Sequence, residues 1–443
     1  MPSPPNDSIE TQQDSVEIID MLDNAVGSIE EITRETEDQQ KIATDTSQPL
    51  DERLEAYEDI IDSEVGDTHF SRARNLERIY GFRQIFLKFE GGNPSGTQKD
   101  RIAFAQAMDA IRRGYDAITV ATCGNYGVAM SVAASLAGLR CLIYIPDNFH
   151  TSRVSEMIKL GGEIVRVPGD YENAVIKSRE RAKKDEIYDA NPGGANTGLQ
   201  LRAYGEIAYE IYDELRDAPA VVAVPMSNGT TLAGIYKGFL SLYRRGKTSR
   251  IPKIVGGSSY NKNPIVQAFL KNKPTCEDLS PERIRETRVN EPLINWHSID
   301  GDYVLWAIRE TSGCAANASD KQLLALSKLI REQVGGVERS PASTAGTPRC
   351  WTRTKNAAAQ RSLRCHFHRT PVVIMGFATV FQNQQCLPAK TVVRHNLKKS
   401  KVKIDRMNFP PLKKPLFPQI LVIDRLEVGP VKLETAADCP TPS

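Results

Sequence analysis

A lysine at the end of a turn-rich loop is the first residue of this sequence that suits nucleophilic chemistry. Lys99 follows the run 91–98, in which glycine and proline mark turns, and a helical pattern begins directly after it. The start of a helix disfavours positive charge, and burial favours the neutral form of an amine. Lys99 is therefore a candidate for forming a Schiff base, with a solvated loop lysine as the equal alternative on this segment alone.

Two further segments lie where a predicted strand passes into a predicted helix. Residues 122–127 offer unpaired backbone N–H groups that can hold a carboxylate, and Asn125 can donate a hydrogen bond to a phenolate-like oxygen. Residues 227–234 supply N–H groups and hydroxyls for a phosphate. They are not a Walker loop and lack the G-x-G-x-x-G pattern of dinucleotide sites. A compact cofactor with one phosphate fits this segment best.

The elements that must position these residues alternate between short apolar runs and amphipathic helical stretches from about residue 84 onward. This alternation predicts a doubly wound α/β architecture with a mostly parallel sheet. The regular pattern ends after Gly346. The predicted strands are 84–90, 117–122, 140–145, 163–167, 220–225, 253–257 and a late run at 371–374. The predicted helices are 98–113, 128–136, 152–160, 171–184, 201–215, 232–243, 300–311 and 320–334.

The composition predicts a soluble enzyme with charged ends. The chain has 443 residues, of which 40% are hydrophobic, so it can bury one large α/β unit or two ordinary domains. Residues 1–67 are rich in acidic side chains and poor in aromatic ones, and we expect a disordered or loosely helical leader there. Residues 347–443 are basic and contain proline, so the net charge is only +2, and we expect an irregular tail.

Several other classes are not favoured. No stretch approaches the roughly 20 apolar residues that span a bilayer and no signal peptide is visible, so we expect a cytoplasmic protein without a membrane partner. The eight cysteines form no C-x-x-C pair, which favours reduced thiols. Cys365, His366 and His368 lack a second ligand pair, so no metal site is predicted. The basic cluster at 398–406 lacks interleaved aromatic residues, so nucleic-acid binding is not expected.

Taken in order, the three segments resemble the fold-type-II enzymes that use pyridoxal phosphate (PLP), and most of all the threonine synthases. Asn-Pro-Ser-Gly-Thr-Gln-Lys-Asp-Arg at 93–101 is similar to the family's Asn-Pro-Thr-Gly-Ser-Phe-Lys-Asp-Arg box. Cys-Gly-Asn-Tyr-Gly at 123–127 resembles its Ser-Gly-Asn-Thr-Gly loop. Segment 227–234 resembles its phosphate cup, and 341–346 its late Pro-Ala-Ser box. The resemblance implies a catalytic domain at about 68–346 with a smaller mobile subdomain at about 117–195.

The resemblance also implies roles for individual residues. Lys99 would hold PLP as a Schiff base and then move protons at the α and β carbons of an amino acid. The implied reaction is that of a lyase in threonine biosynthesis, which converts O-phosphohomoserine and water into threonine and phosphate. Enzymes of this kind are often dimers, so a homodimer is an expectation. The implied cofactor contacts are Asn125, Ser227, Asn228, Gly229, Thr230 and Thr231. The implied substrate contacts are Thr122, Cys123, Gly124, Tyr126, Asn196 and Arg202.

Two departures from the family pattern leave alternatives open. Met375 stands where the family places a hydroxyl that pairs with the pyridine nitrogen. This raises the hypothesis that the C-terminal portion has diverged or comes from a shifted reading frame. Residues 191–196 and Arg202 match only part of the family's loop for a substrate phosphate. The first alternative is therefore a serine/threonine dehydratase or another β-eliminating or β-replacing enzyme of the same fold. The second is a catalytically impaired binding or regulatory relative.

Overall fold

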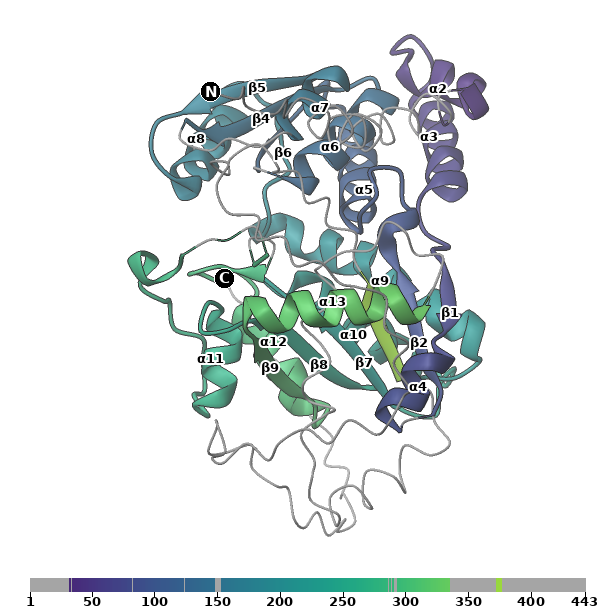
Figure 1. Ribbon diagram of the computed structural model, residues 1–443. Helices are drawn as coiled ribbons and strands as arrows, with labels where there is room; N and C mark the ends of the chain where they lie inside the picture. Colours follow the sequence, from purple (N-terminus) through teal and green to yellow (C-terminus); the bar gives the residue numbers. More distant parts are fainter. Residues whose placement is uncertain are drawn as a thin grey trace, which may run out of the picture. The chain divides into compact units, whose positions relative to one another are not determined.

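Two β-sheets with helices packed against them form the part of the chain that this computed structural model describes (Figure 1). That part comprises residues 32, 34–81, 83–122, 124–147, 153–285, 287, 289–290, 293–334 and 372–376. In the larger sheet the first two strands pair antiparallel, and every other neighbouring pair is parallel. Its strands, in the order in which they lie side by side, are β1 (Phe70–Arg72), β2 (Ile85–Phe89), β10 (Val372–Gly376), β7 (Val221–Pro225), β8 (Lys253–Ser259) and β9 (Cys314–Ala318).

The smaller sheet is wholly parallel and lies within the range expected for the mobile subdomain. Its strands, side by side, are β5 (Gly162–Val167), β4 (Arg140–Pro146), β3 (Ala117–Ala121) and β6 (Tyr188–Asp189). Every residue of β3 is buried, as expected for a parallel strand with both faces covered. The doubly wound α/β prediction is confirmed, and the motion of this sheet stays a prediction.

Helices α9 (Thr197–Leu215) and α10 (Thr230–Arg244) pack at very short range because glycines stand at their contact. A Cβ on Gly238 would fall 2.5 Å from the backbone oxygen of Gly205, and one on Gly234 would fall 2.5 Å from the Cβ of Tyr204. This close approach fixes the position of Tyr204. The other helices beyond residue 73 are α4 (Arg74–Tyr80), α5 (Lys99–Arg112), α6 (Asn125–Leu136), α7 (Arg153–Lys159), α8 (Tyr171–Lys184), α11 (Pro264–Leu270), α12 (Gly301–Glu310) and α13 (Asp320–Val334).

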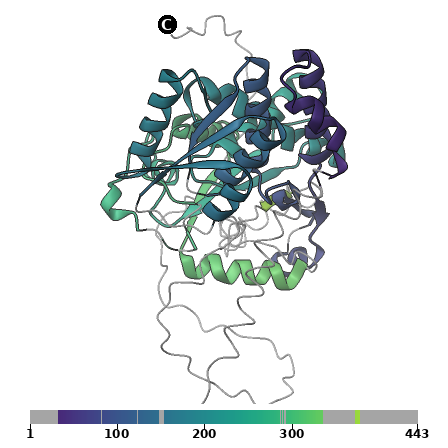
Figure 2. The same ribbon diagram turned by 90° about the horizontal axis from the view of Figure 1, so that it is seen from above.

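Strand β10 comes from late in the chain yet lies in the middle of the larger sheet, between β2 and β7. Val373 and Met375 face the main core, whereas Ile374 faces the opposite side and packs with Leu76 of α4 and Ile330 of α13. Figures 1 and 2 show α13 lying across that side of the sheet. The strand predicted at 371–374 is confirmed by β10. The rest of the predicted tail and the Pro-Ala-Ser box at 341–346 lie outside the described residues.

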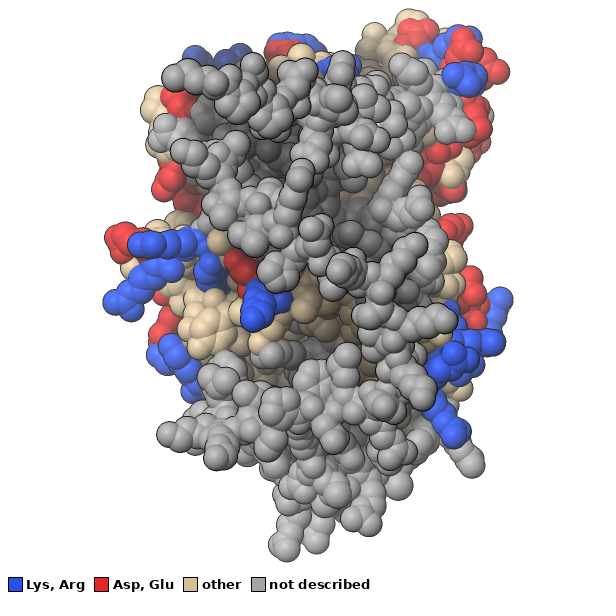
Figure 3. Space-filling model, in the orientation of Figure 1, with Lys and Arg blue, Asp and Glu red and all other residues tan. Residues whose placement is uncertain are grey.

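Two helices occupy part of the acidic range in which we expected a disordered or loosely helical leader. Helices α2 (Glu37–Thr44) and α3 (Leu50–Glu64) pack on the core through Tyr57 and Ile60, and the Tyr57 hydroxyl donates to the carbonyl of Ala133 at 2.8 Å. The expectation of disorder is wrong for these residues and they are helical, because apolar side chains recur at helical spacing among the acids. Acidic side chains gather over these two helices at the upper right of Figure 3. Residues 1–31 lie outside the described residues.

The predicted strands and helices between 84 and 334 are all found in the structure. The six strands predicted in this range begin and end within two residues of the observed ones, and helices 171–184 and 320–334 have the predicted bounds. Three helices begin earlier than predicted, since α6 starts at Asn125, α9 at Thr197 and α10 at Thr230. No described helix is long and apolar enough to cross a membrane.

Candidate active site

Lys99 is the first residue of α5, and its amine has a neutral partner. Its backbone N–H donates to the Thr97 hydroxyl at 3.2 Å, and its Nζ donates to the Tyr204 hydroxyl at 3.3 Å. The Nζ also lies 5.8 Å from the centroid of the Tyr204 ring, which is fully buried on α9. Among the described residues, no carboxylate forms an ion pair with this lysine. A half-buried amine without an acidic partner is suited to nucleophilic chemistry.

The loop before Lys99 is folded around the neighbouring carboxylate of Asp100. Asp100 is completely buried, and its Oδ2 accepts from the Ser95 backbone N–H at 3.0 Å and from the Ser95 hydroxyl at 2.8 Å. Burial raises the pKa of Asp100 to about 7, against the opposing effects of these hydrogen bonds and of the charge of Arg153. Its Oδ1 is buried without a hydrogen-bond partner among the described residues. The shape of the lysine loop therefore depends on one buried carboxylate that is hydrogen-bonded through only one of its oxygens among the described residues.

A buried ion network ties the helix of Lys99 to the helix of Tyr204. Arg101 of α5 pairs with Glu90 after β2 and with Glu210 of α9, each at 2.6 Å, and Lys88 of β2 also pairs with Glu210. Burial raises the pKa of Glu210, but the hydrogen bonds and charges of Arg101 and Lys88 hold it below its usual value. The network fixes α9 against α5 and so keeps the two partner groups together. Sequence reasoning missed Tyr204 and Glu210, because nothing in the sequence links them to residues more than a hundred positions earlier.

The predicted carboxylate-binding segment starts α6 directly after β3. Gly124 is the N-cap and no side chain caps the helix, so the first backbone N–H groups remain available. A Cβ on Gly127 would lie 2.6 Å from the Cε of Met157, so a larger residue there would require the Met157 side chain to move. The Tyr126 hydroxyl donates to the carbonyl of Ala190 at 2.9 Å and receives a hydrogen bond from the amide of Gln106.

The predicted substrate residues of this segment differ in their burial and in their hydrogen-bond partners. The Tyr126 hydroxyl is committed to protein partners in the interior, and its contact with a substrate stays a prediction. Asn125 is only partly buried, and Thr122 is buried at the end of β3. Cys123 lies outside the described residues. Burial, and to a smaller extent the neighbouring Tyr204, raises the pKa of Tyr126, so Tyr204 lies near this segment as well as near Lys99.

The predicted phosphate cup begins α10 after β7. Gly229 is its N-cap with a φ of +85°, and a Cβ there would fall 2.6 Å from Val304, so the turn requires glycine. The Ser227 hydroxyl donates to the carbonyl of Ile294 at 3.1 Å, and the Thr230 hydroxyl donates to Asp300 at 2.7 Å. No side chain caps this helix start, so its backbone N–H groups, rather than these hydroxyls, are available to an anion.

Hydrogen bonds from two asparagine side chains hold the predicted phosphate cup in place. The Asn295 side chain donates to Asn228 at 3.0 Å and to Ser298 at 2.6 Å, and the Asn263 side chain donates to the Ser227 carbonyl at 2.8 Å. Sequence reasoning missed Asn263, Asn295 and Asp300, since none of them belongs to a recognised motif. Thr231, the last predicted cup residue, is buried in the first turn of α10.

The two residues predicted to hold a substrate phosphate do not form a common site. The Asn196 side chain donates to the carbonyl of Asp189 at 2.7 Å and to that of Asn191 at 2.8 Å, so it braces its own loop. Arg202 is exposed on α9. Their contact with a substrate stays a prediction that this geometry does not favour.

The sheet brings the lysine loop and the phosphate cup to one edge. Strands β2, β10 and β7 are parallel neighbours, so the loops that follow β2 and β7 leave the same edge of the larger sheet. Ligands of open α/β sheets bind at the carboxyl ends of the strands. An amine and an uncapped helix start at one edge fit the aldehyde and phosphate ends of PLP. At the position expected for a pyridine partner, the side chain of Met375 is fully buried and has no hydroxyl.

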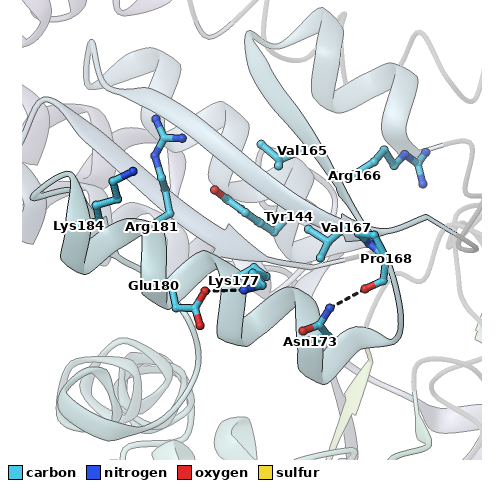
Figure 4. Close-up of a pocket in the computed structure, with 10 residues that line it drawn as sticks. All are labelled: Tyr144, Val165, Arg166, Val167, Pro168, Asn173, Lys177, Glu180, Arg181 and Lys184. Carbon is cyan, nitrogen blue, oxygen red and sulfur yellow. Dashed lines mark hydrogen bonds and ion pairs between the residues drawn. The ribbon is translucent and has the colours of Figure 1, made fainter.

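A surface groove of about 500 Å³ lies elsewhere, beside the smaller sheet (Figure 4). Tyr144 of β4 and Val165 of β5 line it, opposite Lys177 and Arg181 of α8. Lys177 pairs with Glu180 at 2.7 Å, and Arg181 pairs with Asp185. None of the residues that line the groove is a predicted site residue, and its cations are largely paired already.

Comparison with known proteins identifies the family of the chain. A family model described as pyridoxal-phosphate dependent enzyme matches residues 61–345. The threonine synthase of Methanocaldococcus jannaschii is 27% identical over 272 residues, which cover 61% of this chain and 65% of the relative, so the match spans less than two thirds of that protein. The threonine synthase of Halalkalibacterium halodurans is 28% identical over 282 residues, which cover 63% of this chain and 74% of the relative.

Solved structures share the fold at low identity. Maize serine racemase aligns with a TM-score of 0.58 and 16% identity, covering 74% of this chain and 92% of that chain. A processed threonine deaminase isoform 2 from Solanum lycopersicum aligns with a TM-score of 0.56 and 18% identity, covering 74% of this chain and 85% of that chain.

Proposed function

We propose, because the chain belongs to the family of pyridoxal-phosphate-dependent enzymes, that it is a lyase that converts O-phosphohomoserine and water into threonine and phosphate. The observation that carries the proposal is the position of Lys99. This lysine is the first residue of α5, and its amine donates to the phenol of Tyr204. It lies at the same edge of the larger sheet as the glycine turn that begins α10. The threonine synthases among the relatives support this choice of substrate through their similarity.

The residues at this sheet edge suit the cofactor from two directions. Lys99 would hold it covalently through Nζ, and the first backbone N–H groups of α10 would hold its phosphate. Asn125, at the start of α6, is proposed to donate to the ring oxygen. When bound, PLP withdraws electrons from the α-carbon of an amino acid, so that bonds at the α and β carbons can break.

The other steps belong to this chain's own side chains and backbone. The N–H groups at the start of α6 would hold the substrate carboxylate and so select which bond at the α-carbon can react. Lys99 Nζ would then take a proton from the α-carbon and return one to the substrate, as a general acid and base. Tyr204 would keep this amine in one orientation through its hydroxyl.

One observation favours the second candidate, a serine or threonine dehydratase. The amide of Asn196 is engaged with two backbone carbonyls and Arg202 is exposed, so the residues expected at a substrate phosphate do not converge. A site without a phosphate anchor suits serine or threonine better than phosphohomoserine. The threonine deaminase and serine racemase folds are compatible with this alternative.

Substrate challenge separates the two candidates. Purified protein loaded with PLP is offered O-phosphohomoserine, threonine and serine in separate reactions, with Lys99→Ala as the inactive reference. Phosphate release and threonine formation from phosphohomoserine support the proposal. Formation of a 2-oxo acid and ammonia from threonine or serine, without phosphate release, would replace the synthase with the dehydratase.

A catalytically impaired relative is the remaining alternative, and Met375 is the observation behind it. Its buried thioether offers no hydrogen-bond donor to a pyridine nitrogen. The variant Met375→Thr puts a hydroxyl at this position, with Met375→Val as a control of similar shape. If the wild type binds PLP but turns over no substrate, and only the threonine variant gains turnover, the impaired reading is correct.

A further inference from the structure

A buried carboxylate lies against the helix start that we propose to hold the cofactor phosphate. Asp300 is 9% exposed, and its Oδ2 accepts a hydrogen bond of 2.7 Å from the hydroxyl of Thr230, the first residue of α10. Asp300 is itself the N-cap of another helix, α12. The starts of two helices therefore meet at one acidic side chain that sequence reasoning did not single out.

Asp300 places a carboxylate beside the start of α10, where it contacts the Thr230 side chain. The uncapped N–H groups and the dipole of a helix start attract negative charge, and here a carboxylate supplies it. Among the described residues no basic side chain pairs with Asp300. Burial raises its pKa, and the hydrogen bond from Thr230 opposes that rise.

A phosphate at the same helix start would meet this carboxylate at close range. Two anions in a partly buried place repel each other strongly, because little water screens them. The Thr230 hydroxyl is also a poor donor to phosphate while its hydrogen is directed at Asp300. The carboxylate therefore opposes the group that the rest of the cup is suited to hold.

We propose that Asp300 sets the affinity of this chain for its cofactor by competing with the cofactor phosphate for Thr230 and for the start of α10. This inference rests on the proposed function, because it takes residues 227–231 as the phosphate site. It predicts that the chain binds PLP less tightly than the same site with a neutral residue at position 300.

The test compares two neutral variants with two ligands. Asp300→Asn and Asp300→Ser remove the charge, and both new residues are good helix N-caps, so α12 keeps its start. Asp302→Asn is the matched control, because it removes the same charge from the first turn of α12, where Asp302 accepts from the Cys276 N–H at 2.6 Å. Binding of PLP, and of pyridoxal, which lacks the phosphate, is measured by absorbance titration, and thermal unfolding verifies the fold of each variant.

We expect both Asp300 variants to bind PLP about tenfold more tightly than the wild type, since close charges at a protein surface interact by a few kcal/mol before screening. The affinity for pyridoxal should not change in the Asp300 variants. The Asp302→Asn variant should bind both PLP and pyridoxal with the wild-type affinity. Unchanged or weaker PLP binding in folded Asp300 variants, or an equal gain for both ligands, overturns the inference.

The outcomes also separate this inference from the proposed function. If wild type and Lys99→Ala bind PLP equally, the proposed role of the lysine fails. A gain specific to PLP in the Asp300 variants would still uphold the role of Asp300. If no variant at position 300 binds PLP, both ideas are wrong.

Discussion

The starts of α5 and α10 lie at the same sheet edge, but they are built in different ways. The α5 start is held by buried charges, with Asp100 inside the loop and Arg101 between Glu90 and Glu210. The α10 start is held by neutral amides, chiefly Asn263 and Asn295, and among the described residues its hydrogen bonds reach a charge only at Asp300.

The two buried acids, Asp100 and Asp300, differ in their effect because different groups donate hydrogen bonds to them. Asp100 accepts two hydrogen bonds from Ser95 and thereby orders the loop that precedes Lys99. Asp300 accepts one from Thr230 and thereby occupies a donor that an incoming phosphate would need. We expect substitutions at the start of α5 to lower mainly the stability of the chain. Substitutions at the start of α10 should change mainly its affinity for PLP.

The largest effect on stability is expected from breaking the ion network at α5. Arg101→Ala leaves Glu90 buried without its charge partner, and removing one member of a buried pair costs about 3–5 kcal/mol. Arg72→Ala is the control, because its pair with Glu77 at 2.8 Å is partly exposed and worth at most about 1 kcal/mol. Urea unfolding measures both, and equal losses would contradict a special role for the network.

The next effect is the pH dependence that Asp100 introduces. Its pKa is raised from 3.8 to about 7 in the folded chain, so the folded state binds more protons than the unfolded state between these values. Stability is therefore expected to fall as pH rises through this window, by an amount on the order of a few kcal/mol, and then to level off. Asp100→Asn should flatten that slope. A slope equal to the wild type's in urea unfolding at several pH values would show that Asp100 does not cause it.

A smaller loss of stability is expected at the α10 start. Asn295→Ala removes the donor to Asn228 and Ser298, which should cost about 1–3 kcal/mol. Because the cup loses its support, PLP affinity should fall as well. Asn272→Gly, on an exposed turn whose φ of +52° glycine also adopts, serves as the control. If Asn295→Ala destabilises the chain as much as Arg101→Ala does, the contrast between the two helix starts is wrong.

The smallest effect on stability is expected from Tyr204→Phe. The ring stays in its buried place and only the hydrogen bond with Lys99 is lost, which is worth about 1 kcal/mol. The rate at which PLP is trapped on Lys99 by borohydride should nevertheless fall several-fold, because the amine is no longer held in one direction. Tyr209→Phe, whose hydroxyl bonds Ser241 at 3.1 Å on the same helix, should trap at the wild-type rate.

The sequence predicted the architecture and the local motifs better than their long-range partners. The strand and helix of Lys99 follow from apolar periodicity and turn residues near position 99, which are local signals. Tyr204, Glu210 and Asp300 are ordinary residues on helices or at their ends, and only the fold brings them to the site. The leader prediction failed at Tyr57 and Ile60 for a related reason, since charge density hid a helical stripe that the core covers.

The central claim, that Lys99 holds the cofactor, is tested most directly by reducing the PLP-loaded protein with borohydride and locating the label by peptide mass spectrometry. The account predicts a pyridoxyl group on Lys99 in the wild type, none in Lys99→Ala, and full labelling of Lys99 in Lys253→Ala, a control at an exposed lysine. Labelling spread over several lysines, or labelling that persists at the wild-type level in Lys99→Ala, would contradict it.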